Sequence, residues 1–384
     1  MDDEKKAPEI RFEGHTEPWE HYHLSSIANA TYGGGTPSTS RAEYWNGNIP
    51  WIQSSDIKEH NVTSAFARKS ITTKGLESSA AKLVPANSIA VVTRVGVGKL
   101  CILPFEYATS QDMFSLSKLT IDINYGAYSI YTMLQAELNA VQGTSIKGIT
   151  KDELLSKSIL VPNSLDEQAA IGSFFRNLDD TIASKKQQYE QTANIKKAML
   201  EKMFPKNGAD APEIRFEGFA EPWELKYLDE ILTVNTGRDY KHLESGEIPV
   251  YGTGGYMLSV NGWLSDVDGV GIGRKGTIDK PQYLKAPFWA VDTLFFLTAS
   301  KDIDLVFLFA MAQRINWKTY NEATSLPSLS KTVIEKIAQF FPSYSEQVAI
   351  GNFFRSLDNL IESQREELEK LQNVKSACLS KMLV

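Results

Sequence analysis

The sequence predicts an α+β protein built as two similar halves, each made of an irregular globular body followed by a long helix. Three observations lead to this fold class. Residues 7–20 recur at 211–224 with 12 of 14 positions identical, residues 166–204 match 345–383 at an offset of 179 positions, and the stretches between mix short β-like runs with helical patterns. A two-fold plan within one chain favours a two-fold target or a two-fold assembly.

Length and composition narrow the class of protein. The chain has 384 residues, which suits two domains, and its 23% of charged residues is typical of a folded soluble protein. The net charge of −7 argues mildly against promiscuous nucleic-acid binding, although a local basic groove is compatible with it. Cys101 and Cys378 are too few for a disulfide framework or a zinc cage, which favours a reducing cytoplasm.

The sequence predicts neither a secretory signal nor a membrane-spanning segment. The start of the chain, MDDEKK, is acidic and polar, unlike a secretory signal. No apolar run approaches the roughly 18 residues that a membrane span needs.

The first predicted segment, 1–160, opens with the repeated 14-residue tag and continues as a globular body. Short β-like runs such as 89–93 are bounded by turns rich in glycine and asparagine. The glycines at 33–35 lead into an aromatic segment, so that small residues permit a close backbone approach and aromatic rings can wall a groove. Candidates for DNA contact here are Thr36, Ser38, Tyr44 and Arg94. The alternative, that the aromatic residues pack the body itself, stays open.

The second predicted segment, 161–205, is a long helix. Ile171, Leu178 and Met199 alternate with Phe175, Ile182, Tyr189 and Met203 at heptad spacing, and Lys185, Thr192 and Lys196 interrupt the stripe. About 38 residues give a rod of roughly 57 Å. Such a stripe is too long and narrow for one compact domain to cover, although packing on the helix's own domain remains the alternative.

The third predicted segment, 206–342, repeats the plan with a different body. Glycines punctuate a tyrosine-rich stretch at 251–256, and a basic pair follows on a glycine-flanked turn, where it could reach phosphates or a guanine edge. Candidates for DNA contact in this body are Lys241, Tyr256, Arg274 and Lys275.

The fourth predicted segment, 343–384, is the second long helix. Its apolar residues also follow a heptad seam, weakened at Gln364 and Lys375. Two matching rods in one chain most simply pair with each other. We therefore expect an antiparallel coiled coil that separates the two bodies.

Most sequence motifs that would indicate a catalytic site are incomplete in this chain. The glycine-rich runs at 269–277 and 96–99 lack the Lys-Ser/Thr pair of a phosphate-binding loop, and the GxGxG at 269–273 is weak alone. The spacing of His21 and His23 suits a metal on a strand, but no carboxylate or cysteine partner is evident, so we expect a solvated surface. We expect no catalytic residue, no bound metal and no cofactor in this chain, as in a recognition scaffold.

The chain resembles the specificity subunit of type I restriction–modification systems. The resemblance rests on GGGTPSTSRAEYWNGNIPWIQSSDI at 33–57, GTSIKGITKDELLSKSILVPNSLDEQAAIGSFF at 143–175, and the segments YGTGGY, GRKGT and APFWAVDTLFF within 251–296. It covers the chain from about residue 7 to the end. It implies two target-recognition domains that each read one half of a split, asymmetric DNA sequence, held apart by two antiparallel helices.

The resemblance also implies partners and cofactors outside this chain. Two modification subunits would transfer methyl groups from S-adenosylmethionine to adenine N6, and restriction subunits would use ATP and magnesium to translocate and cut DNA. The modification subunits are expected to grip the helices, which makes Phe174, Phe175, Phe353 and Phe354 candidates for that contact. The alternative, that these rings anchor each rod to its own domain, stays open.

Two other classes remain to be separated from this one. A coiled-coil scaffolding protein without DNA readout explains the rods but not two large glycine- and aromatic-rich bodies. A nucleotide-dependent enzyme requires the GxGxG run to be a phosphate site.

Overall fold

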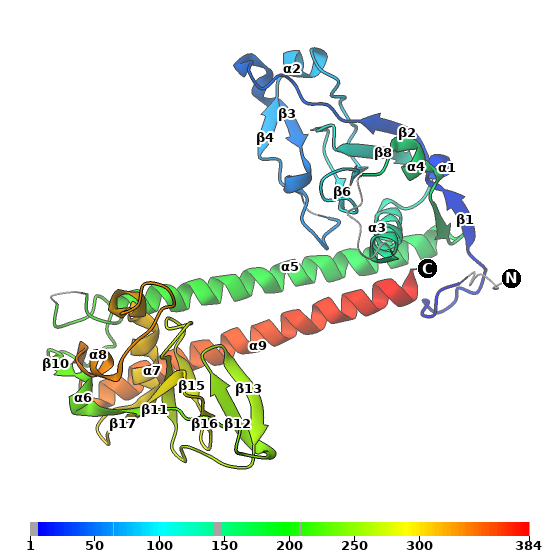
Figure 1. Cartoon of the computed structure of the whole chain (residues 1–384). Helices are drawn as coiled ribbons and strands as arrows, with labels where there is room; N and C mark the ends of the chain where they lie inside the picture. Colours follow the sequence, from blue (N-terminus) through cyan, green and yellow to red (C-terminus); the bar gives the residue numbers. More distant parts are fainter. Residues whose placement is uncertain (1–6, 64, 141–147, 207–208, 384) are drawn as a thin grey trace. The chain divides into compact units, whose positions relative to one another are not determined.

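The computed structural model describes residues 7–63, 65–140, 148–206 and 209–383 (Figure 1). These residues form two compact units, one made of Met1–Lys186 with Glu367–Val384 and the other of Gln187–Glu366. Each unit takes in one half of each long helix, so the division into two units does not test the predicted four segments, which stay a prediction. The opening residues 1–6 and the 143–147 part of the family-like motif lie outside the described residues.

The first unit is built on an antiparallel four-stranded sheet with the order β2-β8-β5-β6. Its strands are β2 (Ala28–Gly33), β5 (Ser88–Val92), β6 (Leu100–Leu103) and β8 (Met113–Leu119). A three-stranded sheet, β4-β3-β7, comprises β3 (Trp45–Ile52), β4 (Lys69–Ile71) and β7 (Ala108–Thr109), and β1 (Glu20–His23) pairs with β9 (Ser158–Val161). The helices are α1 (Leu24–Ile27), α2 (Thr73–Glu77), α3 (Ile123–Ala140) and α4 (Lys151–Ser156), with 3₁₀ turns at Ala42–Tyr44 and Ser54–Asp56.

The second unit repeats this topology strand for strand. Its four-stranded sheet has the order β11-β17-β14-β15, with β11 (Leu232–Thr236), β14 (Gly269–Gly273), β15 (Gln282–Leu284) and β17 (Leu294–Ala299). The order β13-β12-β16 joins β12 (Ser245–Gly252), β13 (Gly255–Val260) and β16 (Trp289–Ala290), and β10 (Glu224–Tyr227) pairs with β18 (Ala338–Phe341). The helices are α6 (Leu228–Ile231), α7 (Leu305–Arg314) and α8 (Lys331–Glu335), with a 3₁₀ turn at Trp317–Tyr320. The α+β prediction is confirmed, and the duplication extends through bodies whose sequences differ.

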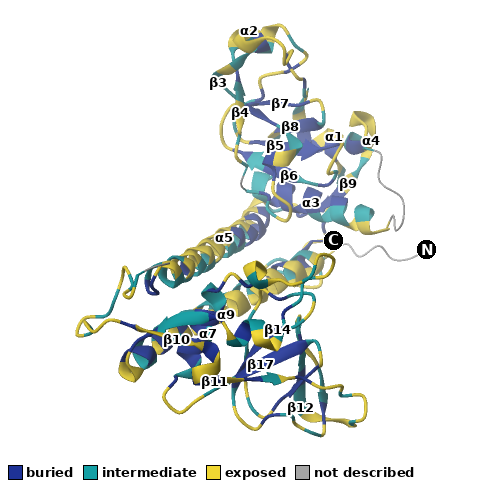
Figure 2. Ribbon diagram, turned by 60° about the vertical axis from the view of Figure 1, so that its left-hand side comes forward, coloured by how far each residue is buried: buried dark blue, intermediate teal, exposed yellow. Residues whose placement is uncertain are grey.

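The cores lie between the sheets and the helices. All five residues of β5 and of β14 are buried, as continuous apolar or small-residue runs predict for central strands (Figure 2). The predicted GxGxG run at 269–273 is therefore strand β14. A Cβ on Gly273 would lie 2.0 Å from the carbonyl oxygen of Thr277, so glycine is required there by close backbone packing rather than by a bound phosphate.

The two long helices begin and end close to the predicted boundaries. Helix α5 spans Leu165–Lys202 and α9 spans Tyr344–Met382. Each starts after a proline whose carbonyl accepts a hydrogen bond from a glutamine one turn into the helix, Gln168 in α5 at 2.8 Å and Gln347 in α9 at 3.0 Å. Every described helix is too short or too polar to cross a membrane.

Within each unit the two helices run antiparallel. In the first unit, Lys185 of α5 contacts Glu367 of α9 at 2.8 Å, and the end of α9 enters the core through Met382 and Leu383. In the second unit, the end of α5 and the start of α9 share a core through Met203 and Phe354. Antiparallel pairing is thus present in both units, whereas regular coiled-coil packing along the seam stays a prediction.

The repeated tag fastens each helix to its body. Arg11 donates two hydrogen bonds to the buried carboxylate of Glu167 at the start of α5, and Arg215 does the same to Glu346 of α9 at 2.7 Å for each bond. Hydrogen bonding to Glu346 raises the pKa of Arg215. The duplication of the tag in the sequence therefore reflects a duplicated ion pair.

Candidate nucleic-acid interface

The strand registers give a common frame in which the two units can be compared residue by residue. In the first unit the backbone N–H groups of Thr93 and Arg94 both donate to the carbonyl of Asp112, at 2.8 and 3.2 Å. In the second unit those of Arg274 and Lys275 both donate to the carbonyl of Thr293, at 2.7 and 3.4 Å. Arg94 and Lys275 therefore occupy the same place in the fold, just after the buried strands β5 and β14. This agrees with the prediction that Arg94 matches the basic pair of the second body.

The glycine loop of the first unit is packed against its own backbone. A Cβ on Gly34 would lie 1.8 Å from the carbonyl oxygen of Ser110, and one on Gly35 would lie 2.3 Å from the amide nitrogen of Ala81. In the second unit Gly237 stands in the place of Gly34, and its Cβ would lie 2.0 Å from the carbonyl oxygen of Val291. The small residues bring this loop against the strand ends, which positions the polar residues that follow it.

Thr36 and Ser38 lie on the exposed side of this loop. The Thr36 hydroxyl donates to the Oε1 atom of Gln111, and the hydroxyls of Ser38 and Ser40 share a hydrogen bond of 2.9 Å. Gln111 directly precedes Asp112, whose carbonyl holds the backbone of Arg94. The structure therefore brings Thr36 and Arg94 to the same turn, and adds Gln111 as an exposed amide that the sequence argument missed.

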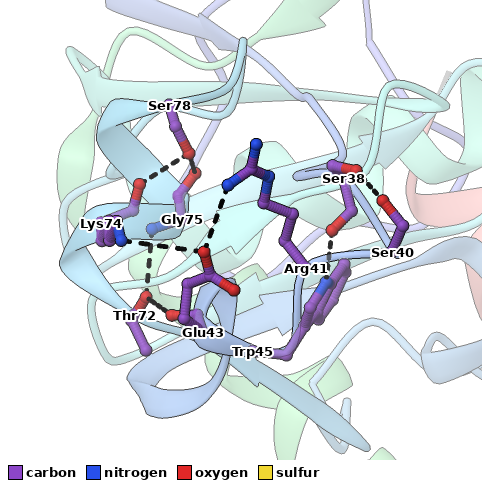
Figure 3. Close-up of polar contacts among 9 residues, drawn as sticks. All are labelled: Ser38, Ser40, Arg41, Glu43, Trp45, Thr72, Lys74, Gly75 and Ser78. Atoms are coloured by element: carbon purple, nitrogen blue, oxygen red, sulfur yellow. Dashed lines mark hydrogen bonds and ion pairs between the residues drawn. The ribbon is translucent and has the colours of Figure 1, made fainter.

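An aromatic and cationic surface adjoins the loop in the three-stranded sheet. Trp45 and Trp51 pack edge to face with ring centroids 5.1 Å apart, and the Lys69 ammonium lies 5.6 and 5.8 Å from their centroids. The Trp45 indole N–H donates to the carbonyl of Ser38 at 3.1 Å (Figure 3). Trp51 is buried, so the alternative that an aromatic residue packs the body holds for this ring.

Tyr44 is half-buried and has two cations near its ring. The guanidinium of Arg41 lies 5.9 Å and the ammonium of Lys74 lies 6.0 Å from its ring centroid. Both cations also reach the Glu43 carboxylate, at 3.5 and 3.7 Å (Figure 3). The pKa of Glu43 is lowered, first by a hydrogen bond from its own backbone and then by these cations, so the carboxylate is ionised at neutral pH. It offsets part of the positive charge that a phosphate would meet here.

A hollow of about 720 Å³ marks the corresponding region of the second unit. Its lining includes the predicted residues Lys241 and Tyr256, both exposed, and the turn from Val291 to Thr293 between β16 and β17. The Tyr256 hydroxyl shares a hydrogen bond of 3.1 Å with Ser259. The hollow carries one lysine, two aspartates, an exposed tyrosine and several glycines, so it offers both donors and acceptors to a flat polar group such as a base edge. The full lining is Asp239, Tyr240, Lys241, Gly252, Thr253, Gly254, Gly255, Tyr256, Met257, Val291, Asp292 and Thr293.

Arg274 borders this hollow but is partly engaged by its own chain. Its guanidinium donates to the carbonyl of Asp292 at 3.3 Å and lies 5.7 Å from the ring centroid of Phe295. Lys275 is exposed, as Arg94 is in the first unit. The predicted second-body residues therefore gather around one turn, with Lys275 the more accessible of the two basic groups.

A tryptophan supports this loop in both units, but from different strands. In the first unit the indole N–H of Trp51 on β3 donates to the carbonyl of Gly35 at 3.0 Å. In the second unit the donor is Trp289 on β16, which reaches the equivalent carbonyl of Arg238 at 2.8 Å. The registers pair Trp51 with Ala108 and Val250 with Trp289, so the large and small residues have exchanged places. The same loop support is therefore present in both units although it comes from different strands.

The predicted partner contact through the phenylalanine pairs is wrong for two of the four residues. Phe175 and Phe354 are 0% and 1% exposed and belong to the cores of their own units, so they offer no surface to another protein. Phe174 and Phe353 are half-buried and pack edge to face on Phe12 and Phe216 of the repeated tag, each at 6.0 Å. The structure thus favours the alternative in which the rings anchor each rod. The physical reason is that the first turns of each stripe face the body before the helix extends beyond it.

The histidine pair does not form a metal site in the described part of the chain. The Nδ1 atom of His23 lies 2.8 Å from the carbonyl oxygen of Ser156, within the first unit. Among the described residues, no group of three or more His, Cys, Asp or Glu side chains is placed to hold a metal ion.

The model of the type I restriction modification DNA specificity domain matches residues 16–193 and again 220–373. The specificity subunit of the type I restriction enzyme EcoprrI from Escherichia coli is 22% identical over 373 residues, covering 92% of this chain and 90% of the relative. The S subunit of a type I restriction–modification system from M. genitalium superposes with a TM-score of 0.72 at 17% identity, covering 98% and 99% of the two chains. A chain from a structure on complex assembly and conformational transition of the type I R-M system gives a TM-score of 0.54 at 14% identity, over 96% and 98%.

Proposed function

The chain belongs to the family of type I restriction–modification DNA specificity subunits, and we propose on that premise that each unit reads one half of a bipartite, asymmetric DNA sequence. The two family matches each take in one body and most of the long helix that follows it. The candidate reading surfaces are the loop with Thr36, Ser38 and Arg94 in the first unit and the hollow with Lys241 and Tyr256 in the second.

One observation carries this proposal: the two bodies share a backbone frame but present different side chains on it. At matched positions of the glycine loop the first unit carries Gly35 and the second carries Arg238, and after the central strand Arg94 matches Lys275. Basic groups at both matched turns suit the phosphate contacts that fix orientation on a duplex, while differing loop residues suit contacts to different bases.

We propose that the chemistry lies in partner subunits. Two modification subunits would methylate adenine N6 with S-adenosylmethionine, and restriction subunits would cut DNA with ATP and magnesium. The relatives are named as subunits of restriction enzymes, which supports assembly with other chains. This chain would contribute recognition without a catalytic residue or cofactor of its own, in the cytoplasm where its DNA is found. A scaffolding role without DNA readout is disfavoured, because it leaves the two duplicated bodies without a purpose.

Exchange of one body tests the proposal. Residues 225–342 are replaced by the matching body of a relative, the complete system is expressed in a host, and the methylated sites are mapped. We expect one half of the recognised sequence to change and the other half to stay, because each body precedes its own helix. A methylome in which both halves changed would refute independent reading.

A further inference from the structure

The long helices carry two equivalent lysine–aspartate pairs on their facing sides. In the first unit Lys375 of α9 pairs with Asp179 of α5, and in the second unit Lys196 of α5 pairs with Asp358 of α9. Asp179 and Lys196 are 17 positions apart on α5, and Asp358 and Lys375 are likewise 17 apart on α9. Both pairs therefore obey one antiparallel register.

The pairs are enclosed and hydrogen-bonded beyond the ion pair itself. The side chains of Lys375 and Asp179 are 8% and 3% exposed. Asp179 accepts a hydrogen bond of 2.7 Å from the Tyr128 hydroxyl, and Lys375 donates to the carbonyl of His60 at 2.7 Å. In the second unit Lys196, 16% exposed, also donates to the Gln313 side chain. A buried charge that loses such partners is strongly unfavourable.

Both lysines occupy seam positions of the heptad pattern, where an apolar residue stabilises most. Sliding one helix by a heptad in one direction sets Lys375 opposite Lys186 and Lys196 opposite Arg365. Sliding it the other way sets the lysines opposite Gly172 and Gly351, and the aspartates opposite Leu368 and Tyr189. Each slip leaves four charged side chains without their partners, of which Asp179 and Lys375 are buried, whereas an all-apolar seam tolerates a heptad slip.

We propose that these two pairs lock the register of α5 against α9, and thereby act as positioning residues for the separation of the half-sites. This register lock, formed by the Lys375–Asp179 and Lys196–Asp358 pairs, is a property of this chain alone, so it can be tested without DNA. Its consequence for the DNA spacer rests on the proposed function. The polar interruptions of the two stripes at Lys196 and Lys375 are, on this account, what gives the helix pair a single alignment.

Cross-linking reports the register directly. In full-length chain whose two native cysteines are replaced by alanine, cysteines at 185 and 367 mark the observed register. Cysteines at 185 and 360 mark the one-heptad slip that sets the lysines opposite glycines rather than opposite other cations. The cysteine pairs are joined with a short bis-maleimide. The test variant is Asp358→Lys, because Asp358 is 35% exposed and a lysine there can reach solvent. It should lower cross-linking of the first cysteine pair at least about threefold and raise cross-linking of the second pair. The exchange Lys196→Asp with Asp358→Lys should restore the original ratio, because the Gln313 amide can turn to donate to the new carboxylate.

Two control variants distinguish a change of helix register from a general loss of stability and from a general effect of charge reversal. Leu357→Ala removes core packing near the pair, so it should lower the melting temperature but leave the ratio unchanged. Glu362→Lys reverses an exposed charge on α9 and should change neither. The lock is overturned if Asp358→Lys leaves the ratio as it was, or if the exchanged pair behaves like the single variant.

The same variants are then expressed with their partner subunits and the methylated sites are mapped. Asp358→Lys should spread residual methylation to altered spacers while both half-sequences stay, and the exchanged pair should restore the original spacer. Unchanged spacers together with a changed cross-linking ratio would keep the lock but refute its link to site spacing. A parent complex that modified no bipartite site would instead refute the proposed function, with the cross-linking result standing by itself.

Discussion

At the scale of single residues, a residue's position in the shared fold indicates a candidate DNA contact better than its type does. The glycine-flanked turn predicts Lys275 as a contact, and the β-like run before Arg94 predicts its counterpart in the first body. The backbone hydrogen bonds to Asp112 and Thr293 place Arg94 and Lys275 at one position of the fold. Gln111, Lys69 and Lys74 were missed, because their proximity to the loop depends on strand pairing between distant segments. No local pattern indicates that pairing.

The first residue-scale prediction concerns DNA affinity. Arg94→Ala and Lys275→Ala should each weaken binding of the assembled complex, and each should reduce the slope of log affinity against log salt by about one if the group contacts a phosphate. Arg274→Ala should weaken binding through the second half-site, by less than Lys275→Ala, because its guanidinium is already engaged by the Asp292 carbonyl. Fluorescence anisotropy across a salt series measures these effects. Lys331→Ala, on α8 and paired with Glu335, is the matched control, and equal losses for all four variants would remove these residues from the site.

At the scale of elements, what repeats in the sequence proved easiest to predict. The tag and the long helices were visible as repeats, and their spans agree with α5 and α9 to within a few residues. The sequence did not show why the tag repeats. The Arg11–Glu167 and Arg215–Glu346 contacts that explain it join residues more than a hundred positions apart. The phenylalanines were misassigned because a heptad stripe does not distinguish a face that meets a partner from one that enters the body's core.

The element-scale prediction concerns the tag's ion pair in the second unit. Arg215→Ala leaves the Glu346 carboxylate, which is fully buried, without its bidentate partner, and should destabilise that unit by about 3 kcal/mol. Glu346→Gln in the same background should recover part of the loss, because a neutral amide tolerates burial better. Calorimetric unfolding of the full chain measures both variants. Lys226→Ala, which breaks an exposed pair with Glu224, should change stability by less than about 1 kcal/mol. A larger loss in the double variant than in Arg215→Ala would contradict this account.

At the scale of the whole molecule, the sequence predicted two bodies and two helices but not how they share their cores. Each unit combines one body with halves of both helices, because the start of one long helix and the end of the other pack on the same body. The bodies can share a backbone while their sequences differ, as Trp51 and Trp289 show by supplying the same loop support from different strands. We propose that each unit reads DNA independently and that α5 and α9, in one register, join the two.

Lengthening the helices tests that account most directly. One heptad is inserted into each helix, near Gln187 and Gln364, so that the apolar seam and both lysine–aspartate pairs keep their facing positions. The helices grow by about 10 Å, roughly three base pairs at about 3.4 Å each, and the added spacing rotates one half-site by roughly a quarter turn. Mapping methylated sites of the complete system should show both half-sequences unchanged with a longer spacer, or loss of modification if the rotation is not accommodated. Full modification of sites with the original spacer would show that the helices do not set the distance, and would contradict the account.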